Sequence, residues 1–154
     1  MQKRNVFFID TEFNGYQGDL ISIALVPLDE SIEPFYREIL QTTEIDPNSW
    51  VGIHVVTKLD GEAIGHAKVQ RDLEAYLTQF ESVTVIADWM DDIKYFCDLM
   101  VTGPGLAIKT PLIETIIDRR IESKSRVPHH AYYDALANRN YYVNYLMNKE
   151  PAHA

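Results

Sequence analysis

The first forty residues of the chain alternate short apolar runs with polar turn segments. Each run has the length and the β-branched or aromatic composition of a strand. The runs that we predict as strands are 6–10, 20–28 and 35–39. Asn14-Gly15 and Gly18-Asp19 mark a turn after the first run, so this part of the chain is predicted to be a β-meander.

Beyond residue 50 several segments have the apolar period of a helix. The clearest is 67–80, where Val69, Leu73 and Leu77 lie on one face. The other predicted elements are a helix at 50–59, a strand at 83–87, a helix ending at Met100 and a final helix at 131–147. The segment 108–121 has no clear period. A meander followed by strand–helix alternation predicts an α/β fold with a mixed central sheet and helices on both faces.

Length and composition predict one folded domain over residues 1–154. The chain is 46% hydrophobic and 24% charged, which excludes a disordered or collagen-like protein. Its one cysteine, Cys97, excludes an internal disulfide. The apolar runs are far shorter than the roughly 20 residues that span a bilayer, and Asp10 and Glu12 interrupt the first of them. We therefore expect no membrane association, no signal peptide and a cytoplasmic location.

Net charge constrains the kind of partner. Lys and Arg number 14 and Asp and Glu number 23, which gives −9 at pH 7. A protein that bound nucleic acid through phosphate neutralisation alone would be basic. Nucleic-acid binding therefore requires that some carboxylates hold cations and that a local basic segment contacts the substrate. The densest basic segment contains Arg119, Arg120, Lys124 and Arg126; its alternative interpretation is a solvated surface loop.

Two acidic clusters follow predicted strands. Asp10 and Glu12 are two residues apart at the end of the first strand, so both carboxylates project from the same face. A divalent cation would relieve their repulsion and desolvation, and hard carboxylate oxygens suit Mg²⁺ or Mn²⁺. Asp88, Asp91 and Asp92 follow a later strand, where open α/β sheets place ligands. The alternatives are two surface acids for the first cluster and a helix cap, at Asp91 or Asp92, for the second.

A third cluster joins His129 to Asp134. Five helical residues turn through about 500°, so the two side chains would lie roughly 140° apart if both were helical. They share a site only if His129 lies in the loop before the final helix, which Pro128 favours. Ala131 and Ala135 flank Asp134 and would let that helix approach the sheet closely. The alternative is a surface histidine pair beside an exposed aspartate.

These three clusters resemble the motifs of the DEDDh group of 3′–5′ exonucleases, which belong to the RNase H-like superfamily. The first motif matches as Phe8-Ile9-Asp10-Thr11-Glu12, and the last, His-x-x-x-x-Asp, matches as His129 and Asp134. The second motif of the family reads Asn-x-x-x-Asp. Here Asp88 replaces the Asn and Asp92 takes the Asp position.

The resemblance implies an RNase H-like fold and hydrolysis with two Mg²⁺ or Mn²⁺ ions per active site. The implied catalytic and metal-binding residues are Asp10, Glu12, Asp92 and Asp134, with His129 as the general base. Asp88 and Asp91 are competing ligands to Asp92. His130 is the alternative base, because a sister group has a tyrosine four residues before the last Asp and His130 occupies that place.

The implied activity is release of nucleoside 5′-monophosphates from single-stranded or overhanging RNA 3′ ends. The choice of RNA comes from a narrower resemblance of 49–59 to the mycobacterial-type DEDDh exoribonucleases. The residues expected to contact substrate are Phe13, Trp50, His54 and Arg126. Core packing for Trp50 and a surface histidine for His54 are the alternatives. The functions left open are a DNA-directed 3′–5′ exonuclease of the same fold, a non-catalytic RNase H-like nucleic-acid-binding module and a small acidic interaction protein; the family resemblance also allows a homodimer.

Overall fold

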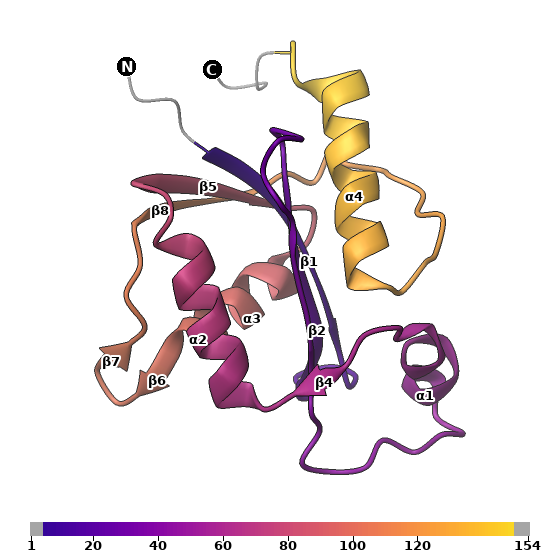
Figure 1. Ribbon diagram of the computed structural model, residues 1–154. Coiled ribbons are helices and arrows are strands. Elements are labelled where there is room, and N and C mark those ends of the chain that lie inside the picture. Colours follow the sequence, from indigo (N-terminus) through magenta and orange to yellow (C-terminus); the bar gives the residue numbers. More distant parts are fainter. Residues whose placement is uncertain (1–4, 150–154) are drawn as a thin grey trace.

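The computed structural model describes residues 5–149, which form a six-stranded sheet and a small two-stranded sheet (Figure 1). The order in the large sheet is β4-β3-β2-β1-β5-β8. Its strands are β1 (Asn5–Phe13), β2 (Leu20–Pro27), β3 (Phe35–Ile39), β4 (Ala63–Ile64), β5 (Ser82–Ala87) and β8 (Leu112–Ile117). Neighbours β1–β2 and β2–β3 are antiparallel, and the other three pairs are parallel. The small sheet pairs β6 (Val101–Gly103) with β7 (Leu106–Ala107).

Helices cover both faces of the large sheet, so the predicted α/β fold with a mixed sheet is confirmed (Figure 1). The helical segments are α1 (Trp50–His54), η1 (Val56–Lys58), α2 (His66–Leu77), α3 (Met90–Met100), α4 (Ala131–Tyr141) and η2 (Tyr142–Leu146). The helices α2 and α3 pack on one face and α4 packs on the other. Within residues 5–149 every helix is too short or too polar to cross a lipid bilayer.

The alternation of side chains along β1 decides which residues reach each helix. Phe7 and Ile9 are buried in the core that β1 shares with α2 and α3, whereas Phe8 belongs to a separate core on the face of α4. Asp10 and Glu12 therefore lie on the face of α4, at the end of the strand where the apolar residues stop.

Small residues bring α4 close to the sheet. Ala131 and Ala135 are fully buried and pack against Ala24 and Val26 of β2. Because Ala24 is the β2 residue opposite Asp10, this contact also places the start of α4 beside the acidic end of β1. The close approach predicted from Ala131 and Ala135 is confirmed.

Three local predictions differ from the structure. The helix expected at 50–59 is divided at Val55 into α1 and the 3₁₀ turn η1, and the final helix changes to a π turn at Tyr142. The alternative in which Asp91 or Asp92 caps α3 is wrong, because the N-cap residue is Trp89 and both aspartates lie in the first turn. The aspartates instead accept hydrogen bonds from the Trp89 indole and from Thr11, respectively.

Candidate functional site

Acidic side chains from β1, α3, α4 and the turn after β5 meet at the carboxyl ends of β1 and β5. One carboxylate oxygen each from Asp10, Asp88 and Asp92 lies within 4.8 Å of the others. A second group contains Glu12, His129 and Asp134. One possible ligand atom from each of these residues also lies within 4.8 Å of the others. The four acids predicted as metal ligands therefore lie in two groups of possible ligands, and Asp88 joins one of them.

Glu12 connects the two groups. Its carboxyl lies within hydrogen-bonding reach of both Asp10 and Asp134. Burial raises the pKa of Asp10 well above its ordinary value of 3.8, and the nearby charges of Asp92 and Glu12 raise it further. All the carboxyls are thus close enough to repel one another when they are ionised.

The same two causes act on the neighbouring acids. Burial, followed by the charge of Asp134, raises the pKa of Glu12 from 4.5 to about 8. Burial also raises the pKa of Asp92 from 3.8 to about 7, although the Thr11 hydroxyl and backbone N–H donate to its carboxylate at 2.6 and 3.0 Å. Without a cation, the fully ionised site is strongly disfavoured at neutral pH.

Unpartnered oxygens show that a divalent cation fits these residues. Asp10 Oδ2 and Asp134 Oδ1 are buried and accept no hydrogen bond from residues 5–149. Buried polar atoms in folded proteins nearly always have a partner. Hard carboxylate oxygens at this density are the donors that Mg²⁺ and Mn²⁺ prefer, and a cation would supply both the missing partner and the missing positive charge.

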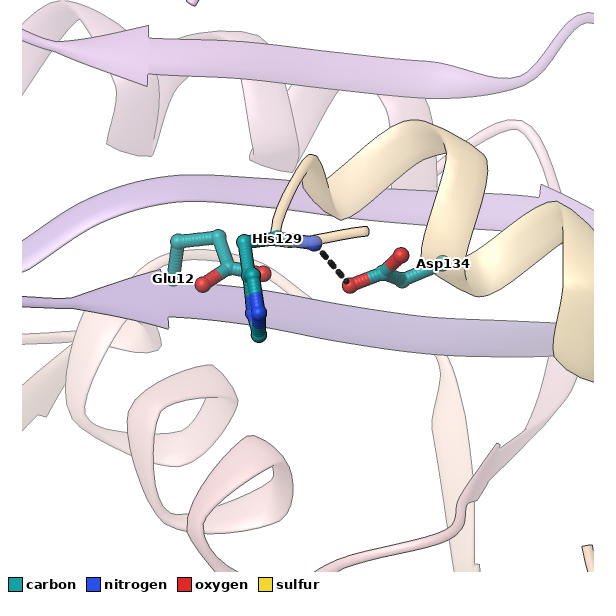
Figure 2. Close-up of side chains that lie close together, drawn as sticks. All are labelled: Glu12, His129 and Asp134. Atoms are coloured by element: carbon teal, nitrogen blue, oxygen red, sulfur yellow. Dashed lines mark hydrogen bonds between the residues drawn. The ribbon is translucent and has the colours of Figure 1, made fainter. Parts of the chain in front are cut away.

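His129 lies in the loop before α4, as the spacing to Asp134 predicted. Its backbone N–H donates to Asp134 Oδ2 at 3.1 Å, and its ring extends beside Glu12 (Figure 2). His129 has a φ of +69°, which a residue with a Cβ rarely adopts. Such backbone strain concentrates at functional sites.

Trp50 and His54 form an aromatic wall next to His129. The Trp50 ring centroid lies 5.0 Å from that of His129 and 4.8 Å from that of His54. Trp50 is 57% exposed, so the alternative of core packing is wrong for this residue. Both residues stand at the site where a substrate role was predicted for them, and that role stays a prediction.

Phe13 and Arg126 do not line the cavity that contains Asp10 and Asp134. Phe13 stacks on Tyr95 with 4.5 Å between ring centroids, so Tyr95 covers one face of its ring. Arg126 is exposed and lines a groove beside the site, while the site's own cavity of about 480 Å³ is lined by Lys124 from the same loop. Of these two cations, Lys124 is the one that lines the cavity of the site.

The basic segment is not a uniform patch. The Arg120 guanidinium pairs with Asp118 at 2.7 Å, and Arg119 lies over the Trp89 ring at 4.5 Å. Lys124 and Arg126 form no ion pair with any residue in the described part of the chain. These two side chains are the free cations of the predicted segment.

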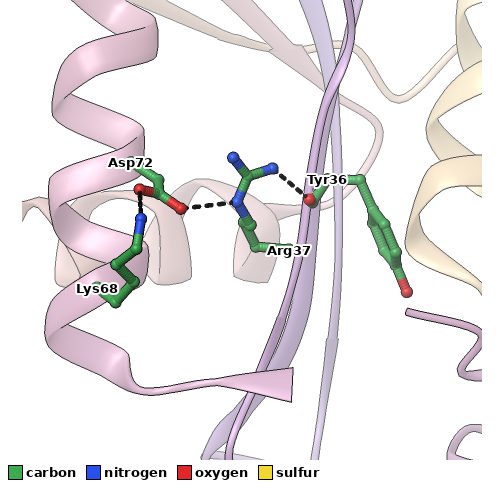
Figure 3. Close-up of polar contacts among 4 residues, drawn as sticks. All are labelled: Tyr36, Arg37, Lys68 and Asp72. Carbon is green, nitrogen blue, oxygen red and sulfur yellow. Dashed lines mark hydrogen bonds and ion pairs between the residues drawn. The ribbon is translucent and has the colours of Figure 1, made fainter. Parts of the chain in front are cut away.

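His130 belongs to a different cluster from His129. It is 3% exposed, its ring stacks on Tyr36 at 4.9 Å, and its Nε2 lies 2.8 Å from Asp60 Oδ1. Tyr36 projects from β3 away from its neighbour Arg37, which reaches Asp72 of α2 on the other side of the sheet (Figure 3). His130 therefore ties the start of α4 to β3 and to the loop before β4.

Sequence reasoning missed Thr11 and Asn138. Thr11 lies between the two motif acids and bonds Asp92 from the opposite face of β1. Asn138 is 3% exposed, hydrogen-bonds Asp88 and accepts a hydrogen bond from the Ser123 hydroxyl. Its position four residues after Asp134, on the same helix face, is a signal that points to the site.

The raised pKa values predict how stability changes with pH when metal is removed. Above about pH 4.5 the folded protein holds a proton on Glu12 up to about pH 8 and one on Asp92 up to about pH 7, whereas the unfolded chain has released both. Stability from these groups is thus complete at low pH and is lost as pH rises through about 7 to 8. We expect the free energy of unfolding in EDTA to fall by on the order of 3 kcal/mol in total between about pH 4.5 and pH 8.

Urea denaturation in EDTA at several pH values measures this loss. In the same measurement with Mn²⁺ in place of EDTA, the bound cation should restore stability at the high-pH end. Glu12→Gln should flatten the metal-free profile, whereas Glu44→Gln, at an exposed loop position, should leave it as in the wild type. Superimposable profiles for the wild type and Glu12→Gln would contradict the prediction.

The chain matches no protein-family model and no curated protein sequence. The residues of the site are a set of buried and partly buried carboxylates in two adjacent groups, a histidine beside one group and an aromatic wall beside that histidine.

Proposed function

We propose that the protein is a metal-dependent 3′–5′ exoribonuclease with an RNase H-like fold, which releases nucleoside 5′-monophosphates from single-stranded or overhanging RNA 3′ ends. The observation that carries this proposal is the convergence of Asp10, Glu12, Asp92 and Asp134, with two buried carboxylate oxygens that lack a partner within residues 5–149. The mixed sheet with helices on both faces supports the fold.

The two ligand groups suit two cations. Asp92 and Asp88 would hold one, Glu12 and Asp134 would hold the other, and Asp10 would contribute to both, since its carboxyl is close to every one of these acids. Two bound Mg²⁺ or Mn²⁺ ions would supply positive charge to the attacking and leaving oxygens of an in-line displacement at phosphorus. Thr11 fixes the orientation of Asp92 through two hydrogen bonds.

His129 is the proposed general base. Histidine takes up and releases protons near neutral pH, and a base must stand within hydrogen-bond reach of the proton that it accepts. The ring of His129 lies beside the Glu12–Asp134 group, where the attacking water would be held. The hydrogen bond from its backbone to Asp134 and the packing of Trp50 keep the ring at that position.

The surroundings of His129 favour a single-stranded end. Trp50 presents an exposed ring at the edge of the site, on which a terminal base can stack. A base in a 3′ overhang can turn out and stack on an aromatic ring, whereas the bases inside a duplex are already paired and stacked on one another. The preference for RNA over DNA is supported by the resemblance of 49–59 alone.

The proposal is tested by incubating the protein with 5′-labelled single-stranded RNA and Mn²⁺ or Mg²⁺. We expect a ladder that shortens from the 3′ end, nucleoside 5′-monophosphates as products, and complete inhibition by EDTA. Matched DNA of the same sequence should be degraded more slowly. Absence of mononucleotides with both metals would refute the nuclease, and faster cleavage of DNA would refute the choice of RNA.

A further inference from the structure

A groove of about 230 Å³ lies beside the candidate site and shares part of its wall. It lies between the loop at 123–126 and the outer side of α4. The loop belongs to the segment that connects β8 to α4 and passes beside that helix (Figure 1). Ser123 and Lys124 line both this groove and the cavity that contains Asp10 and Asp134. The groove therefore adjoins the cavity of the proposed catalytic site.

One face of α4 and its π-helical extension forms the floor of the groove. The polar and aromatic residues on this face are Tyr133, Asn140, Tyr141, Asn144 and Tyr145. Their spacing of three, four and seven residues keeps them on one side of the helix. The rings of Tyr141 and Tyr145 lie 4.9 Å apart, and Tyr145 is 59% exposed. This face offers aromatic rings and side-chain amides to a ligand.

The charge of the groove is opposite to that of the protein. Lys124 and Arg126 line it, and neither forms an ion pair within the described part of the chain. Among the described residues that line the groove none is acidic, although the chain contains 23 acidic residues. A groove with free cations and no carboxylate suits an anionic partner.

We propose that this groove binds the single-stranded RNA that lies 5′ of the scissile nucleotide. Lys124 and Arg126 contact its phosphates, and bases stack on the tyrosine rings. The groove is smaller than the roughly 300 Å³ at which small-molecule pockets begin, and it is open along its length, so a strand passing over it fits better than an enclosed ligand. This inference rests on the proposed function, because it uses that site as the position of the 3′ end.

Binding without catalysis tests the groove. Fluorescence anisotropy with Ca²⁺ in place of Mg²⁺ or Mn²⁺, which neutralises the carboxylates but is a poor substitute in hydrolysis, compares a labelled RNA of about ten nucleotides with one of about three. The shorter RNA cannot pass from the site along α4. The wild type should bind the longer RNA at least about tenfold more tightly. Tyr145→Ala and Arg126→Ala should each weaken binding of the longer RNA by about five- to tenfold.

The salt dependence separates an electrostatic contact from a structural effect. Arg126→Ala should reduce the slope of log affinity against log salt by about 0.7, the value for one phosphate contact on a single strand. The matched control is Arg71→Ala, an exposed arginine on α2 at the opposite face of the sheet, which should change neither affinity nor slope. Arg126 lies on an exposed loop, so its variant tests the groove even where Tyr145→Ala folds poorly.

Equal binding of the two RNA lengths by the wild type would overturn the inference, as would an unchanged salt slope in Arg126→Ala. Failure of the proposed function has a different signature. In that case the Mn²⁺ assay yields no mononucleotides, whether or not RNA binding depends on length.

Discussion

Asp10→Asn is expected to abolish metal-dependent release of mononucleotides and, at the same time, to stabilise the metal-free protein. Asp10 is buried among four other carboxyls, and its Oδ2 has no partner in the described part of the chain. An amide keeps the shape but removes the charge that both proposed cations require. Activity should fall by about a thousandfold or more, because several kcal/mol of transition-state stabilisation are lost. The free energy of unfolding in EDTA at pH 8 should rise by about 1 kcal/mol.

The matched control is Asp91→Asn. Asp91 lies next to Asp92 in the first turn of α3, but its carboxylate accepts a hydrogen bond from the Trp89 indole at 2.9 Å and belongs to neither ligand group. This variant should retain activity and the stabilisation by Mn²⁺. A fully active Asp10→Asn enzyme, or one destabilised in EDTA, would contradict the metal site.

The periodicity of the sequence predicted the parts of the site that depend on local geometry. Asp10 and Glu12 share a face because strand side chains alternate, and the structure places both on the side of α4. The angle between His129 and Asp134 on a helix required His129 to lie outside α4, and it does. Both inferences used only residues that are close together in the chain.

Contacts between distant segments explain what the sequence left open. A helix cap for Asp92 was a reasonable local prediction, but Thr11, 81 residues away, donates two hydrogen bonds to the same carboxylate. Whether Asp88 or Asp91 accompanies Asp92 also depends on the neighbours: Asp88 lies beside Asp10, whereas Trp89 holds Asp91. No local pattern contains this information.

The strand β8 was missed for a different reason. It is an edge strand whose residues are mostly exposed on both faces, and Leu112 is 70% exposed. A strand of this kind lacks the regular burial that produces an apolar period.

The helix at Trp50 shows a different limit. The helical period of the sequence predicts a helix there but does not indicate which face of that helix lies beside His129.

His129→Ala is the second change with a large expected effect. Loss of a general base lowers turnover by about 10²- to 10⁴-fold. The carboxylates remain in place, so Mn²⁺ should still raise the midpoint of thermal unfolding as it does in the wild type. Turnover and the Mn²⁺-induced shift are therefore measured on the same variant. The ring of His129 also lies within the Glu12–Asp134 group. If His129 were a metal ligand, His129→Ala would therefore lose both turnover and the Mn²⁺-induced shift.

His130→Ala provides the comparison. His130 is buried, stacks on Tyr36 and contacts the exposed Asp60, so its removal leaves a cavity at the start of α4. We expect a loss of about 1–3 kcal/mol in the free energy of unfolding. Turnover should fall much less than in His129→Ala, because α4 keeps Asp134 near Glu12 through its packing of Ala131 and Ala135. If His130→Ala instead abolished turnover at unchanged stability, the base would be His130, and the strained loop at His129 would serve only to position Asp134.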